Sequence, residues 1–133
     1  MPAPTVTPTS VVVTAAPPPL PVCQDNLTYR EDLTIPDGNT VAPETVLDKR
    51  WRVENSGTCN WDAHYRLKLT AGSDMGAMQD QALYPARAKS DVILRIEFTA
   101  PAEPGTYRSS WQAFGPDSKP FGDPVFIDII VSK

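Results

Sequence analysis

Residues 92–98 of the sequence read VILRIEF, with an apolar side chain at every second position. The positions between them hold Ile93, Arg95 and Glu97. Alternation with a period of two is typical of a β-strand that has one buried face and one solvated face. No stretch of the chain shows a convincing helical period, so this pattern favours an all-β fold.

The same alternation recurs on both sides of this stretch. Residues 47–54 read LDKRWRVE, and Leu47, Lys49, Trp51 and Val53 share one face. Further strand patterns occupy residues 66–69, 107–113 and 125–131, and turn-forming sequences separate them at residues 36–39, 55–57, 71–74, 101–105 and 115–117. Short strands between turns predict an immunoglobulin-like antiparallel β-sandwich of seven to eight strands.

A tyrosine near the start of one strand supports the immunoglobulin type. Residues 104–107 read PGTY, as in a tyrosine corner, where the phenol oxygen bonds back to upstream backbone. Antibody domains carry a cysteine two residues after this tyrosine, and this chain has Ser109 there. We expect Trp51, Tyr107 and Trp111 to be aromatic residues of the core.

The first 22 residues differ in composition from the rest. They contain no charged side chain and no histidine, but seven of the fifteen prolines and four threonines. Proline fixes φ and removes a hydrogen-bond donor, so we predict an extended tether over 1–22 and one domain over 23–133. Because Met1 is followed by no signal-peptide pattern, we expect it to begin a fragment whose parent has an export signal upstream.

Charge and hydropathy exclude several classes of partner. The formal charge is −4 and the sequence pI is about 4.8, whereas nucleic-acid binding favours a basic face. No apolar run approaches the roughly 20 residues of a membrane helix. We expect a monomer, and a solvated mixed-charge sheet face formed by Lys49, Arg50, Arg52, Arg66 and Lys68 with the acidic residues between them.

The two cysteines, Cys23 and Cys59, lack the CxxC spacing and clustered histidines of a zinc site. A disulfide would join the start of the domain to the loop after the Trp51 strand. Closing that loop is worth about 4 kcal/mol in the chain-entropy model. It would imply an oxidising compartment; the alternative is two free thiols in a reducing cytosol.

Residues 51–61, WRVENSGTCNW, resemble the signature of the four-tryptophan (FW) domain, an immunoglobulin-like module of selective-autophagy cargo receptors and of bacterial surface proteins. The resemblance extends over most of residues 23–133. Its further segments are residues 34–43, 98–101, 104–112 and 121–124. The first three family tryptophans match Trp51, Trp61 and Trp111, whereas Phe126 replaces the fourth as an aromatic core contact.

The resemblance implies a protein-recognition platform without catalytic residues. Bacterial members of the FW group follow a Thr/Pro-rich linker, as this domain does. Together with the expected disulfide, this places the chain in the bacterial group. We therefore predict an extracellular or cell-surface location, in a bacterium.

The residues offer no constellation for catalysis. His64 is the single histidine, and neither a Gly-x-Ser-x-Gly elbow nor an oxyanion loop accompanies it. Glu31 or Asp32 together with Asp37 resembles an acid pair, but Glu31 and Asp32 lie on an early strand and Asp37 lies in a turn. No calcium-loop spacing or dinucleotide-binding glycine pattern is present. We predict no enzyme, no metal and no cofactor.

The remaining function is recognition of a protein or a glycan by a non-catalytic extracellular module. The first candidates for the binding surface are loop residues, with Trp61 expected to be partly exposed after its turn. They are Trp61, His64, Tyr65, Met75, Met78 and Tyr84. For the two methionines, capping one end of the core is the alternative. The alternative function is a structural spacer or accessory domain of a larger protein.

Overall fold

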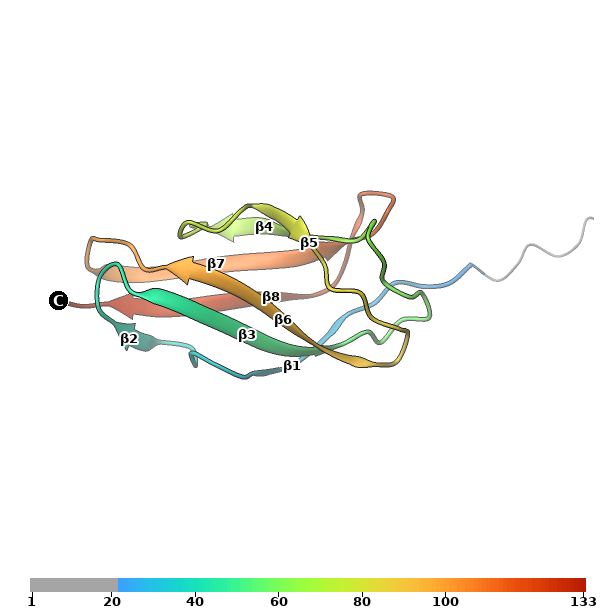
Figure 1. Cartoon of the computed structure of the whole chain (residues 1–133), viewed down its shortest axis with the longest axis horizontal. Helices are drawn as coiled ribbons and strands as arrows, with labels where there is room; N and C mark the ends of the chain where they lie inside the picture. Colours follow the sequence, from blue (N-terminus) through green and yellow to red (C-terminus); the bar gives the residue numbers. More distant parts are fainter. Residues whose placement is uncertain (1–21) are drawn as a thin grey trace, which may run out of the picture.

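The computed structural model describes residues 22–133 (Figure 1). The prediction of an extended tether over 1–22 falls, apart from Val22, outside the described residues. The described chain contains eight β-strands, in agreement with the predicted seven to eight. They are β1 (Thr28–Asp32), β2 (Asn39–Val41), β3 (Val46–Glu54), β4 (Arg66–Gly72), β5 (Asp80–Ala82), β6 (Asp91–Thr99), β7 (Gly105–Phe114) and β8 (Pro120–Val131).

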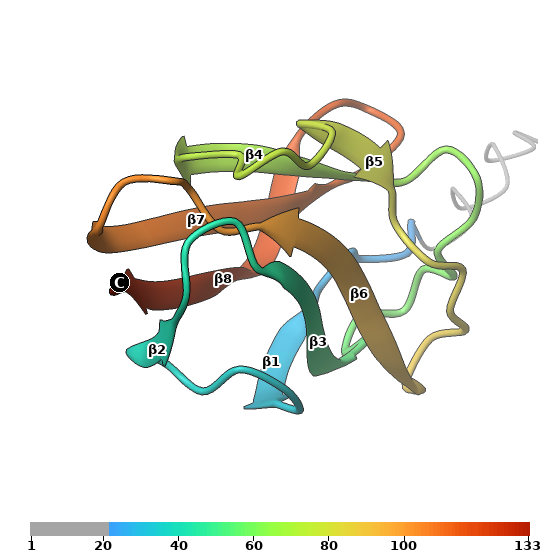
Figure 2. The same cartoon turned by 60° about the vertical axis from the view of Figure 1, so that its left-hand side comes forward.

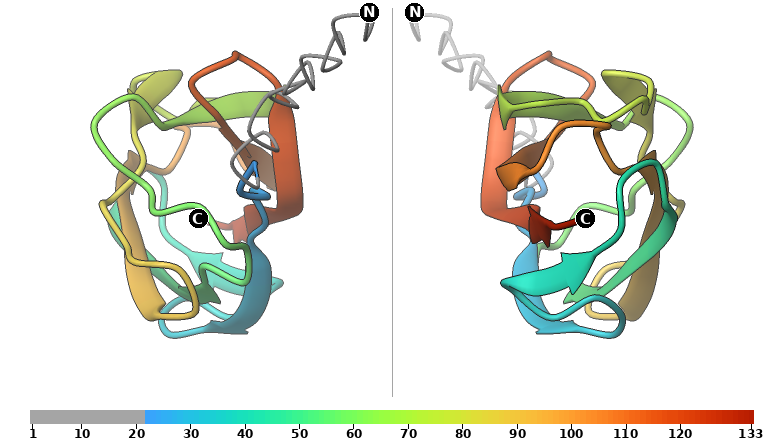
Figure 3. Two further views of the ribbon diagram at one scale, coloured as in Figure 1. Left: turned by 90° about the vertical axis from the view of Figure 1, so that its right-hand side faces the viewer. Right: turned by 90° about the vertical axis from the view of Figure 1, so that its left-hand side faces the viewer.

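The strands form two facing sheets, seen end-on in Figure 3. One sheet has the order β1-β3-β6 and the other β2-β8-β7-β4-β5. The immunoglobulin-like sandwich is therefore confirmed, with one difference from the predicted antiparallel pairing. After β1 the chain crosses to the other sheet. There β2 runs parallel to β8, with Asn39 opposite Ile129 (Figure 2).

The core forms where the alternating patterns of the two sheets meet. Trp51 and Trp111 are fully buried, and the rings of Trp111 and Phe98 lie 6.1 Å apart. The indole Nε1 of Trp111 donates a hydrogen bond to Ser109 Oγ at 2.8 Å. A hydroxyl thus partners the core tryptophan at the position where antibody domains carry a cysteine.

Phe126 does not belong to the core, contrary to the expectation from the resemblance. The odd-numbered neighbours Val125 and Ile127 are buried, and the period of two directs Phe126 to the outer side, where it is half-buried. The guanidinium of Arg108 lies 4.4 Å from its ring centroid. The indole Nε1 of Trp51 donates a hydrogen bond to the Phe126 carbonyl oxygen at 2.9 Å.

The tyrosine corner is confirmed. Tyr107 is half-buried against the core, and its hydroxyl donates a hydrogen bond to the Glu103 carbonyl oxygen at 2.7 Å.

Replacing Tyr107 by phenylalanine removes this bond and keeps the ring. We expect the free energy of unfolding to fall by about 1 kcal/mol, the typical net worth of one hydrogen bond. Urea denaturation measures the change. Tyr84→Phe is the control, because the exposed Tyr84 makes no hydrogen bond through its hydroxyl within residues 22–133. Equal stability of the two variants would contradict the role of the corner.

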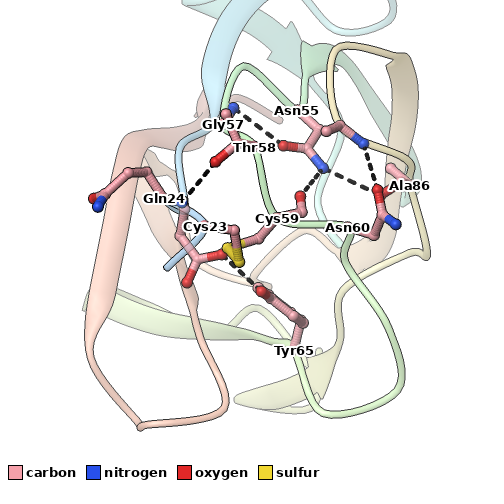
Figure 4. The surroundings of a disulfide bond; sticks show 11 residues. Cys23, Gln24, Asn55, Gly57, Thr58, Cys59, Asn60, Tyr65 and Ala86 are labelled. Carbon is pink, nitrogen blue, oxygen red and sulfur yellow. Dashed lines mark hydrogen bonds between the residues drawn. A yellow bond between two sulfur atoms is a disulfide. The ribbon is translucent and has the colours of Figure 1, made fainter. Parts of the chain in front are cut away.

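The predicted disulfide joins Cys23 and Cys59, at a sequence separation of 36 (Figure 4). Beside it, Thr58 N–H donates to Gln24 O at 2.8 Å and Gln24 N–H donates to Thr58 Oγ1 at 2.7 Å. A Cβ on Gly57 would lie 2.3 Å from Gln24 O, so only glycine permits this close approach. The disulfide and these contacts fix the entry of the chain into the domain.

Candidate binding groove

A groove of about 280 Å³ opens at the side of the sandwich, between β1 of one sheet and β8 of the other. Aromatic, aliphatic and acidic side chains line it together: Tyr29, Asp32, Asp37, Asp123, Pro124, Val125 and Phe126. Its residues come from β1, from the crossing segment between β1 and β2, and from the first half of β8. The groove lies in the part of β8 that β2 does not cover, because β2 pairs only with residues 129–131.

A β-bulge explains why Tyr29 and Asp32 face the same groove. In a regular strand, residues three apart point to opposite sides. In β1 the register shifts between Tyr29 and Glu31, which inserts an extra residue. As a result, Tyr29 pairs with Val53 and Asp32 with Trp51, both buried inward-facing residues of β3.

Lys49 holds the crossing segment in place from inside the sandwich. Its side chain is fully buried, and Nζ donates to Asp32 Oδ1 at 2.9 Å and to the carbonyl oxygens of Thr34 and Ile35 at 2.8 Å each. The expectation that Lys49 lies on a solvated face is wrong. The inward position of β3 buries the stem, and three oxygens replace water around the ammonium group.

The β8 wall of the groove is tied to the segment before β1. Gly122 has φ of +73°, and a Cβ there would lie 2.6 Å from the backbone N of Leu27. This close approach lets Asp123 N–H donate to Leu27 O at 2.9 Å. In return, Tyr29 N–H donates to Asp123 Oδ2 at 2.9 Å. Both walls of the groove are therefore positioned by hydrogen bonds across it.

The groove is acidic. Three of its seven lining residues are aspartates, and none is cationic. Burial first, then the neighbouring carboxylates of Asp32 and Asp37, raise the pKa of the Tyr29 phenol. The neighbouring carboxylates oppose a further negative charge, so Tyr29 ionises at a higher pH than an ordinary tyrosine.

Three of the predicted surface residues are buried instead. Trp61, Tyr65 and Met75 are each less than 5% exposed. Trp61 packs at 6.1 Å from Phe121, measured between ring centroids, and its Nε1 has no hydrogen-bond partner among the described residues. The backbone of Trp61 bridges to Ala86, which folds the loop over the end of the core.

Tyr65 and Met75 are buried for similar reasons. The Tyr65 hydroxyl donates to Asp25 Oδ1 at 2.7 Å, and burial followed by this bond raises the pKa of Tyr65. Met75 joins the core cluster, as the capping alternative expected. Met78, Tyr84 and His64 are exposed.

The structure does not bring the six predicted residues together. Tyr65 precedes β4 and Met75 follows it, and β4 is seven residues long. At about 3.3 Å per residue, the two loops lie about 20 Å apart. None of the six lines the groove, and the binding role of the exposed ones stays a prediction.

None of the groove residues was predicted from the sequence as part of a binding surface. Asp32 and Asp37 stood out in the sequence only as a weak acid pair, and no sequence signal places the bulge that joins Tyr29 to them.

Outside this groove, the described residues form few arrangements suited to catalysis or metal binding. His64 Nδ1 lies 3.2 Å from Asp62 Oδ1, with both side chains exposed to solvent. Between residues 22 and 133, no group of three or more His, Cys, Asp or Glu side chains is placed to hold a metal ion. In the same part of the chain, no helix is long and apolar enough to span a membrane. Among the described residues, the groove is therefore the strongest candidate for a binding site.

Comparison with known proteins identifies relatives over most of the domain. A family model described as "Ig-like domain from next to BRCA1 gene" matches residues 34–131. The Next to BRCA1 gene 1 protein of Homo sapiens is 35% identical over 103 residues, which cover 75% of this chain and 11% of that protein. Protein ILRUN of Danio rerio is 26% identical over 108 residues, covering 81% of this chain and 38% of that protein. Protein NBR1 homolog of Arabidopsis thaliana is 28% identical over 104 residues, covering 75% of this chain and 15% of that protein.

These matches correct the predicted location. The relatives are proteins of animals and a plant, so the expectation of a bacterial protein, extracellular or at the cell surface, is wrong. That expectation relied on the proline-rich stretch and the disulfide, and neither feature is specific to one group of organisms. The chain spans 38% or less of the length of these relatives, so it corresponds to one domain of each.

Proposed function

Because the chain belongs to the family of the Ig-like domain from next to BRCA1 gene, we propose that it is a non-catalytic domain that binds another protein, and that it does so through the groove between β1 and β8. The tryptophans at the first three FW positions are all buried, so they stabilise the core and cannot contact a partner. They are Trp51, Trp61 and Trp111. The partner must then meet other residues, and the groove offers them.

One observation carries the proposal: packed elements fix the walls of the groove, while Tyr29, Asp37, Asp123 and Pro124 of its lining are exposed. Lys49, Trp51 and the Leu27–Asp123 backbone bond fix its walls. In contrast, Tyr29 is 38% exposed and Asp37 is exposed as well. A concave surface with an exposed aromatic side chain and fixed walls is the kind of site that anchors a partner at low entropic cost.

A phage-displayed library of random peptides, selected on the whole chain, tests this function. We expect Tyr29→Ala to weaken the selected peptides by at least about tenfold, as loss of a central aromatic anchor does. The matched control is Tyr84→Ala, which removes the same side chain at similar exposure from outside the groove. Thermal unfolding verifies that both variants are folded.

Two results would overturn the groove as the binding site. Selected peptides that lose affinity only with Tyr84→Ala would move the site to the predicted loop residues. A library that yields no binder to the folded chain would favour the spacer function. That second candidate has its own support, because the described chain enters at the disulfide end and leaves at the opposite end of the sandwich (Figure 1).

A further inference from the structure

The backbone of the groove is poorly suited to pairing with an added strand. Asp123 N–H is already bonded to Leu27 O, and Pro124 has no N–H to offer. The Phe126 carbonyl oxygen accepts the indole N–H of Trp51. A partner therefore has to be recognised through the side chains that line the groove.

Those side chains combine apolar walls with uncompensated negative charge. Lys49 neutralises Asp32 from the buried side, at 2.9 Å. Arg108, which lies over Phe126, is paired with Asp128 at 3.0 Å. In contrast, neither Asp37 nor Asp123 forms an ion pair with a cationic side chain of residues 22–133.

Asp37 differs from Asp123 in having no internal partner. Asp123 accepts the Tyr29 N–H, whereas the Asp37 carboxylate accepts no hydrogen bond from the part of the chain that the structure describes. Asp37 lies in the exposed turn before β2, and its charge contributes to raising the pKa of Tyr29. An exposed carboxylate beside an aromatic ring suits the charged end of a long cationic side chain, whose aliphatic stem packs on the ring.

We propose that the groove binds a lysine or arginine side chain presented by a segment of the partner protein. The inference rests on the proposed function and names the chemistry of its partner. The stem would lie along Tyr29 and Pro124, and the cationic group would meet Asp37 and Asp123. Charge complementarity of this kind selects basic segments over apolar or acidic ones.

The test uses blocked pentapeptides Gly-Gly-Xaa-Gly-Gly, in which Xaa is lysine, arginine, leucine or glutamate. They are titrated into the whole chain while amide NMR spectra are recorded. We expect the lysine and arginine peptides to shift the amides of the groove with dissociation constants of about millimolar order, a range suited to so small a contact. Raising NaCl from about 50 mM to about 500 mM will weaken both peptides, because exposed charges are screened.

Asp37→Asn is the matched variant, and Asp91→Asn is its control. Both substitutions remove one negative charge from an exposed aspartate, but Asp91 begins β6 and lies outside the groove. We expect about a tenfold loss of affinity for the lysine peptide with Asp37→Asn, as for one lost charge-assisted contact. Asp91→Asn should leave the affinity within about twofold.

The outcomes separate this inference from the proposed function. Equal shifts with the leucine peptide, or equal affinities of the two variants, would overturn the cationic ligand. Selected library peptides that still require Tyr29 would then preserve the groove as a binding site. If no pentapeptide shifts the groove and the library binders do not depend on Tyr29, both proposals are wrong.

Discussion

Replacing both Cys23 and Cys59 by alanine will lower the free energy of unfolding by about 4 kcal/mol. The disulfide closes a loop with a sequence separation of 36, and the chain-entropy model assigns about this value to a loop of that length. The bond fastens the segment before β1 to the loop after β3, so its loss also frees the contacts around Gly57. Urea denaturation under non-reducing conditions measures the effect.

Reducing the wild-type disulfide provides the control for this prediction. Unfolding of the wild-type chain in excess dithiothreitol should approach the stability of the double variant, because both lack the same cross-link. A loss below about 1 kcal/mol in the double variant would show that the hydrogen bonds between Gln24 and Thr58 hold the segment without the disulfide.

Replacing Lys49 by methionine will cost about 3 kcal/mol of stability. The methionine keeps the apolar stem but leaves Asp32 Oδ1 and the carbonyl oxygens of Thr34 and Ile35 without their donor. Removing one partner of a buried ion pair leaves the other charge uncompensated, which is costly. Urea denaturation compares Lys49→Met with Lys119→Met, an exposed lysine whose loss should change stability by less than about 0.5 kcal/mol.

A double-mutant cycle with Asp32→Asn separates the ion pair from the rest of the loss. Once Asp32 is neutral, Lys49→Met should lower the free energy of unfolding by less than it does in the wild type, because no unpaired carboxylate is left. Strictly additive losses would mean that the carbonyl oxygens, and not Asp32, account for the role of Lys49. Wild-type stability of Lys49→Met would contradict the role of Lys49 in holding the crossing segment.

The sequence predicted most of the fold because its strands have one buried and one solvated face. The inward residues of β6 and β7 follow the period of two, as the burial of Leu94, Ile96 and Trp111 shows. The tyrosine corner was also predictable, since its bond from Tyr107 to Glu103 spans only four residues. Patterns of this kind depend on local geometry, which a sequence records directly.

The pattern did not distinguish an apolar inward residue from Lys49. Lys49 occupies an inward position of β3, but whether a lysine there stays buried depends on oxygens supplied by the chain 14 to 17 residues earlier. The burial of loop residues also depends on contacts that are distant in sequence. Trp61 and Tyr65 are buried because Phe121 and Asp25, distant in sequence, pack against them.

By itself, the sequence determined the all-β class, the burial of Trp51 and Trp111 in the core, and the pair of cysteines. Only the tertiary structure formed the groove that we propose as the binding site. The groove needs a bulge that turns Tyr29 and Asp32 to one side, a crossing segment anchored by Lys49, and a stretch of β8 that β2 leaves uncovered. Its residues come from two sheets and lie almost 100 positions apart, so their proximity follows from strand order and register and not from any local pattern.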